Sequence, residues 1–130
     1  MVSKRIVIGL AVVAVIAMLY FLLNGPQPKG YYDEFATCIS ATGAKMYGAY
    51  WCPHCAEQKK AFGNSWHYIN YVECSLPNNA GQTPVCNAAN IATYPTWEFA
   101  GGKRIEAVLS FDRLAAETGC NPRPTNSTQN

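Results

Sequence analysis

The chain has 130 residues, of which 49% are hydrophobic and 14% charged, and its formal net charge is +2. That small surplus comes from Lys4, Arg5 and Lys29 near the N-terminus, so the rest of the chain has no basic stripe, which argues against nucleic acid as a partner. The roughly 100 residues that follow residue 30 suffice for one domain with a single hydrophobic core.

Residues 6–23 contain no charged side chain and are long enough to predict one transmembrane helix. Because Lys4 and Arg5 precede them, we expect residues 1–5 to stay in the cytoplasm and the rest of the chain to cross the membrane. A cleaved signal peptide is the alternative, but its apolar core is normally shorter. Both interpretations place the remainder on the extracytoplasmic side, in a periplasm or lumen, after a Pro/Gly linker at 24–30.

The next elements alternate between helix and strand. Residues 32–41 predict a helix with Phe35 and Ile39 on one face, and residues 44–50 predict a strand. A second helix is expected over 56–62 and a second strand over 68–72. This alternation is typical of an α/β domain.

Between the first strand and the second helix lies Trp51-Cys52-Pro53-His54-Cys55. Two cysteines two residues apart can form and open a small disulfide, and a strand–motif–helix setting indicates redox chemistry. Cys52 at the helix start should have a lowered pKa and act as the nucleophile, because the helix N-terminus favours an anion. Cys55, one turn further on, should be the more covered, resolving thiol.

The residues around the two cysteines are expected to modulate them. Pro53 suits the first turn of a helix, where a missing N–H costs little. His54 should stabilise the thiolate and so make the disulfide a stronger oxidant, and Trp51 should border the substrate groove. Half of a zinc site is the alternative interpretation of the motif, but zinc would require a second close pair of cysteines. We expect no metal and no cofactor.

Tyr94-Pro95-Thr96 lies downstream, directly before a strand-like run at 96–99. A proline that enters a strand here looks like the cis-proline that lies against the active cysteines of thioredoxins, although an ordinary trans turn is the alternative. We expect the Thr96 backbone N–H to lie beside Cys52 and to pair with an extended substrate. Gly101-Gly102 predicts a hairpin turn to a strand at 104–109, and a last helix is expected over 111–118.

Residues 32–120 resemble thioredoxin-like domains, and more narrowly the domain fused to, or partnered with, vitamin K epoxide reductase homologues. The segments that carry this resemblance are 35–38, 47–55, 71–74 and 94–97. The Pro-His dipeptide is also shared with the periplasmic oxidase DsbA. The resemblance implies a thioredoxin-like α/β fold over 31–120, with a central mixed β-sheet flanked by helices.

The same resemblance implies a protein thiol-disulfide oxidoreductase that forms or isomerises disulfides in cysteine-containing exported proteins. A quinone-linked membrane partner of the vitamin K epoxide reductase type would re-oxidise the motif, as a separate chain. One position departs from the pattern: thioredoxin has a buried acidic residue six positions before its first active cysteine, and this chain has Met46 there. Proton transfer at Cys55 must then use water or another group, for which we consider the neighbourhood of Glu57.

The other four cysteines allow three disulfide pairings. We choose Cys74–Cys86, because it would close a flexible loop and contribute about 3 kcal/mol in the entropic picture, which leaves Cys38–Cys120. One of these pairs could instead relay electrons to the motif. Residues 121–130 predict a disordered tail, in which Asn126 begins a glycosylation sequon.

Two further functions remain open at this point. A reductant of the same fold, of the kind that serves cytochrome maturation, would have the same anchor and differ only in reduction potential. A non-enzymatic metal-binding module would use Cys52, Cys55 and His54, but would need more ligands than these.

Overall fold

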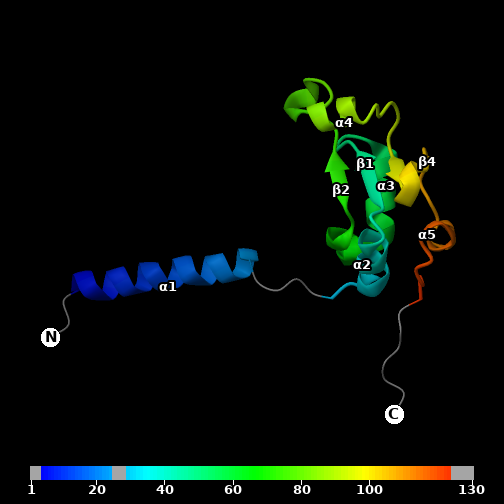
Figure 1. The fold of residues 1–130 in the computed structure, drawn as a ribbon. Helices are drawn as coiled ribbons and strands as arrows, with labels where there is room; N and C mark the ends of the chain where they lie inside the picture. The colour runs from blue at the N-terminus through cyan, green and yellow to red at the C-terminus, as the bar shows by residue number, and fades with distance from the viewer. Residues whose placement is uncertain (1–3, 25–28, 124–130) are drawn as a thin grey trace, which may run out of the picture.

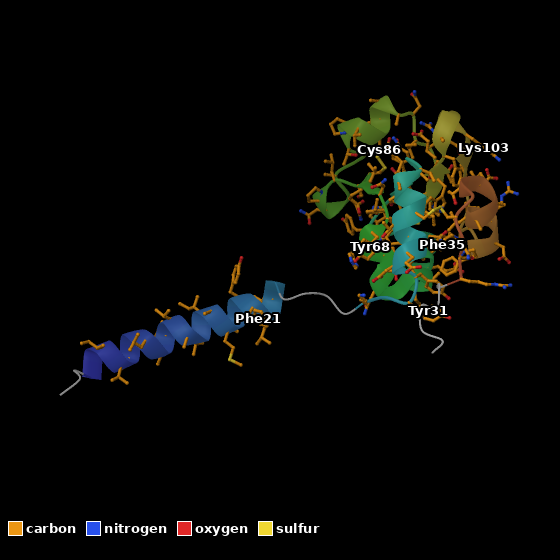
Figure 2. The ribbon with its side chains drawn as sticks, turned by 60° about the horizontal axis from the view of Figure 1, so that its bottom comes forward. Phe21, Tyr31, Phe35, Tyr68, Cys86 and Lys103 are labelled. Atoms are coloured by element: carbon orange, nitrogen blue, oxygen red, sulfur yellow. A yellow bond between two sulfur atoms is a disulfide. The ribbon has the colours of Figure 1, made fainter. Side chains whose placement is uncertain are left out.

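The computed structural model describes residues 4–24 and 29–123. The expectations for residues 1–3, for most of the linker and for the end of the tail with its sequon therefore lie outside the described residues. Helix α1 (Lys4–Asn24) contains an 18-residue span, Ile6–Leu23, with a mean hydropathy of 3.0 and no part of it buried. Figure 1 shows α1 apart from the remaining elements, and Figure 2 shows side chains such as Phe21 projecting outward from it. By length and composition, this helix can cross a membrane.

The domain is built on a four-stranded mixed sheet in the order β2-β1-β3-β4. Its strands are β1 (Lys45–Gly48), β2 (Tyr71–Glu73), β3 (Thr96–Glu98) and β4 (Arg104–Ile105). β1 pairs parallel with β2 and antiparallel with β3, which in turn pairs antiparallel with β4. The connection from β1 to its parallel neighbour contains a helix, as a parallel pair requires. The expected α/β class with a central mixed sheet is confirmed.

Helices cover both faces of the sheet. They are α2 (Asp33–Ala41), α3 (Pro53–Phe62), α4 (Pro84–Ala88) and α5 (Phe111–Thr118), with short 3-10 segments η1 (Gly63–Tyr68), η2 (Pro77–Asn79) and η3 (Ala100–Gly102). Aromatic rings from three helices meet in the core, where Phe111 lies 5.4 Å from Phe35 and 4.8 Å from Phe62 between ring centroids. This contact fixes α3, and with it the Cys-x-x-Cys motif, against α2 and α5.

The two faces of β1 supply two hydrophobic clusters, because successive side chains of a strand point to opposite sides. Met46 and its cross-strand neighbour Trp97 belong to the larger cluster, with residues of α2, α3 and α5. Tyr47 belongs to a smaller cluster with Cys74, Cys86 and Ile91, next to α4. The central strand is therefore covered on both sides.

All four predicted strands are shorter in the structure. Those expected over 44–50 and 96–99 form β1 (Lys45–Gly48) and β3 (Thr96–Glu98), and the other two differ more. The strand expected over 104–109 ends at Ile105, because the backbone N–H and C=O of Leu109 bond to the side chain of Gln58 instead of to another strand. The expected two-residue hairpin turn is a longer loop, closed by a hydrogen bond from Phe99 N to Lys103 O (2.8 Å). The strand expected over 68–72 begins at Tyr71, since η1 extends through Tyr68.

Candidate active site

Cys52 lies at the junction between β1 and α3. It is the N-cap residue of α3, and its Sγ accepts a hydrogen bond from the Cys55 backbone N–H at 3.4 Å. Pro53 occupies the first turn, as expected, where its lack of an N–H leaves no helix bond unmade. The start of α3, where the N–H groups are free and the dipole is positive, thus lies at the Cys52 sulfur.

The two motif cysteines are free thiols with different environments. Cys52 is 5% exposed and Cys55 only 1%. Burial raises the pKa of the Cys55 thiol to about 12, an effect that a backbone hydrogen bond at Ala49 and the charge of Lys59 partly offset. Cys55 therefore holds its proton at neutral pH and must lose it before it can attack a mixed disulfide.

The backbone of Tyr94 closes the other side of the site. The Tyr94–Pro95 peptide bond is cis, and the Tyr94 carbonyl oxygen accepts from Cys52 Sγ at 3.7 Å. The placement of the Thr96 N–H beside Cys52 stays a prediction, and the structure shows that Thr96 is 1% exposed and lies opposite Tyr47 in the sheet. The backbone group that the structure places at Cys52 belongs to Tyr94, the residue before the proline, because Thr96 is already part of β3.

A small hollow of about 160 Å³ borders Trp51, the chain neighbour of Cys52, and Tyr94, whose carbonyl contacts Cys52. Its lining consists of Trp51, Ser75, Asn79, Gly81, Gln82 and Tyr94. The Trp51 ring is half exposed, packs edge-on against Tyr94, and donates from Nε1 to Ser75 Oγ at 2.8 Å. Gln82 donates to the Tyr94 hydroxyl. Sequence reasoning missed Ser75 and Gln82, which come from loop segments without a recognisable pattern.

His54 points away from the sulfur that it was expected to modulate. Its side chain is 70% exposed, and its Nδ1 lies 3.7 Å from the carboxylate of Glu57, which is itself 67% exposed. Among the residues that the structure describes, His54 makes no hydrogen bond to Cys52. The structure thus gives neither His54 nor Glu57 a contact with the motif sulfurs.

The remaining cysteines form two disulfides, in the pairing chosen above. Cys38–Cys120 joins α2 to the residue that follows the α5 cap, across 82 residues, and Cys74–Cys86 joins the end of β2 to α4. Cys74 and Cys86 have no exposed surface. A sulfur that a partner thiol cannot reach is a poor electron relay, so the burial favours a structural role for Cys74–Cys86. In the described part of the chain, no three His, Cys, Asp or Glu side chains gather as a metal site.

No family model matches the chain. The chain is 36% identical over 102 residues to the thiol-disulfide oxidoreductase LTO1 of Arabidopsis thaliana. The match covers 75% of this chain but only 27% of that protein, so the chain spans about a quarter of its relative's length. Because the match covers three quarters of the chain, it necessarily includes the middle of the sequence, where Cys52, Cys55 and Pro95 lie.

Proposed function

We propose that this chain is a membrane-tethered protein thiol-disulfide oxidoreductase, acting through Cys52 and Cys55 in a thioredoxin-like domain over residues 31–120. The observation that carries the proposal is the pair of free thiols at the N-terminus of α3, with the Tyr94 carbonyl 3.7 Å from Cys52 Sγ. The similarity to a thiol-disulfide oxidoreductase supports the same activity.

In the oxidising direction, a substrate thiolate attacks the Cys52 sulfur of the Cys52–Cys55 disulfide, and Cys55 leaves and takes up a proton. A second substrate thiolate then attacks the substrate sulfur of the mixed disulfide and releases Cys52. The substrate loses two electrons and the motif gains two. Turnover therefore needs an electron acceptor, and we assign that role to a quinone-linked membrane partner of the vitamin K epoxide reductase type.

The substrates in this proposal are cysteine-containing segments of exported proteins. An extended segment would pair with the backbone of Tyr94, as peptides do when they add to an exposed strand end. Its side chains would contact the half-exposed ring of Trp51 and the adjoining hollow. Such backbone recognition imposes little sequence preference, which suits an enzyme with many substrates.

The proposed location follows from α1. Lys4 and Arg5 lie before the apolar span, so residues 1–5 would face the cytoplasm and the domain the opposite side. Intact cells are first treated with a membrane-impermeant reductant, because a re-oxidised motif has no free thiol, and labelling with a membrane-impermeant thiol reagent then tests this orientation. Cys52 should react without permeabilisation, whereas labelling only after permeabilisation would reverse the orientation.

A reductant of exported proteins is the second candidate function, and one observation favours it. The Pro-His dipeptide was the argument for a strong oxidant, yet His54 lies beside Glu57 and not beside Cys52. Without a charge from His54, the thiolate would be less stable and the disulfide less oxidising.

The reduction potential of the Cys52–Cys55 pair distinguishes the two functions. We expect equilibration of the full chain, in detergent micelles, with glutathione to give a potential above roughly −200 mV, the range of oxidants and isomerases. A value near about −270 mV would establish the reductant instead. Cys52→Ser serves as the negative control, and a wild-type chain with no redox transition would overturn the proposal.

A further inference from the structure

Cys55 needs a proton acceptor that the sequence pattern does not provide. Its thiol is 1% exposed, and burial raises its pKa to about 12, so water alone removes the proton slowly at neutral pH. Met46 occupies the position of the acidic residue of thioredoxin, and a thioether cannot accept a proton usefully. Glu57 lies at the surface beside His54. The acceptor must come from another element.

Gly48 at the end of β1 brings a candidate within reach. A side-chain carbon built on Gly48 would lie 2.8 Å from Cys55 Sγ and 3.2 Å from the Tyr71 hydroxyl oxygen. The sulfur of Cys55 on α3 and the hydroxyl of Tyr71 on β2 therefore both border the space that a side chain at Gly48 would fill. Gly48 pairs with Glu73 in the parallel ladder, and Tyr71 lies two residues before Glu73 on the same face of β2. This register brings the Tyr71 side chain to Gly48.

The Tyr71 hydroxyl is connected to a carboxylate. It donates to Glu73 Oε2 at 2.9 Å, while Glu73 Oε1 accepts from the backbone N–H groups of Tyr50 (3.1 Å) and Ser75 (2.9 Å). These three bonds hold the Glu73 carboxylate in place. Among the described residues, Tyr71 is the side chain that donates to this carboxylate.

The charges around the pair are arranged for proton transfer. Burial and the Glu73 carboxylate raise the pKa of Tyr71, so the phenol stays protonated and can only pass a proton on. From α3, Lys59 Nζ lies 3.8 Å from the centre of the Tyr71 ring, and its charge favours the Cys55 thiolate. The titratable and charged groups that interact with Cys55 are Cys52 and Lys59, from the N-cap and body of α3, and Tyr71 from β2. Glu73 lies behind Tyr71 and contacts its hydroxyl.

We propose that Tyr71 and Glu73 form the proton relay of Cys55. This deepens, and rests on, the proposed oxidoreductase function. When Cys55 resolves a mixed disulfide, its proton moves to the Tyr71 oxygen while the Tyr71 proton moves to Glu73. The Cys55 thiolate then attacks Cys52, the Cys52–substrate bond breaks, and the substrate leaves as a thiolate. When Cys55 is instead the leaving group, the same protons return in the opposite direction.

The relay can be tested in the two successive steps of one reaction. The reduced full chain in detergent micelles is mixed with 5,5′-dithiobis(2-nitrobenzoate) in a stopped-flow instrument. Attack by Cys52 releases the first coloured thiolate at a rate that depends on reagent concentration. Attack by Cys55 on the mixed disulfide then releases the second coloured thiolate, at a rate that is independent of reagent concentration. Only the second step uses the proposed relay.

We expect Tyr71→Phe to slow the second phase at pH 7 at least roughly tenfold, since general base catalysis usually contributes more than that. The first phase should change less than about twofold. The slowed phase should accelerate in proportion to hydroxide concentration, a pH profile that a purely structural role would not produce. Glu73→Gln should act in the same way, because its amide can still accept from Tyr50 and Ser75 but cannot take a proton.

Tyr68→Phe is the matched control, because it removes a hydroxyl from an exposed tyrosine outside the site. It should leave both phases unchanged. Equal second-phase rates and equal pH profiles in wild type, Tyr71→Phe and Glu73→Gln would overturn the relay and leave the proposed function standing. If the wild-type chain shows no second phase, or shows one that is also present in Cys55→Ser, the proposed function itself is contradicted.

Discussion

Gln58 is a buried amide that ties the motif helix to the segment before α5. It is fully buried on α3, one turn beyond Cys55. Its Oε1 accepts from Trp97 Nε1 (3.2 Å) and from Leu109 N (2.7 Å), and its Nε2 donates to the Leu109 carbonyl (3.1 Å). Gln58→Leu keeps most of the side-chain volume but leaves three buried polar groups without partners.

The size of the effect follows from those three groups. Each buried donor or acceptor left unpaired costs about 1–3 kcal/mol. Burial of the apolar leucine side chain returns about 2 kcal/mol. We therefore expect Gln58→Leu to lower the free energy of unfolding by about 1–7 kcal/mol, up to a large part of the ~5–15 kcal/mol that stabilises a typical domain.

Urea unfolding followed by tryptophan fluorescence measures this loss, because all three tryptophans lie outside α1. Lys60→Leu, also on α3 but exposed, is the matched control and should change stability by less than about 0.5 kcal/mol. A loss below about 1 kcal/mol for Gln58→Leu, with an unchanged m-value, would refute the reasoning.

Three further outcomes are expected. Iodoacetamide at pH 7 should label Cys52 before Cys55, because the pKa of Cys55 is raised to about 12. Labelling of Cys55 should increase as the pH rises toward that value. Peptide mapping gives the order, and labelling of Cys55 first would make Cys55 the nucleophile and Cys52 the resolving thiol. Mild reductant should open the disulfide of exposed Cys38 before that of fully buried Cys74, and simultaneous opening would show that burial does not control access. Burial would raise the pKa of Glu98, but hydrogen bonds from basic groups on β1 and β4 lower it overall. Ionised Glu98 therefore stabilises the fold above its unfolded pKa near 4.5, and this stabilisation is lost as the pH falls through the lower folded pKa. Glu98→Gln should make stability depend less steeply on pH in this range, and an equally steep acid transition would contradict the assignment.

Local signals explain why parts of the fold could be predicted from the sequence. Helix α5 has the predicted bounds of Phe111–Thr118, and both of its ends are determined by adjacent residues. Ser110 Oγ accepts from Arg113 N at 3.2 Å, and Gly119 adopts a left-handed φ of 75°. The strand, the Cys-x-x-Cys motif and the helix around Cys52 could be predicted for the same reason, because adjacent residues determine where α3 begins.

The groups that sequence reasoning missed depend on contacts between distant residues. Glu73 bonds to the backbone of Tyr50, 23 positions earlier, and Gln58 to Leu109, 51 positions later, so no window of sequence shows either contact. His54 failed for the opposite reason. It is adjacent to the motif cysteines in sequence, but the helix turns its side chain toward Glu57.

The disulfide between Cys38 and Cys120 spans 82 residues, which makes the order of synthesis matter. Cys52 emerges from the ribosome long before Cys120, and closure of the much shorter loop from Cys38 to Cys52 is favoured by roughly 1.5 kcal/mol of chain entropy. The loop from Cys52 to Cys55 is shorter still and emerges almost at once, so in an oxidising compartment the same entropy favours closure of the motif before Cys52 can pair with Cys38. Early closure of the motif would thus protect the nucleophile and leave Cys38 for Cys120, the last cysteine to be made.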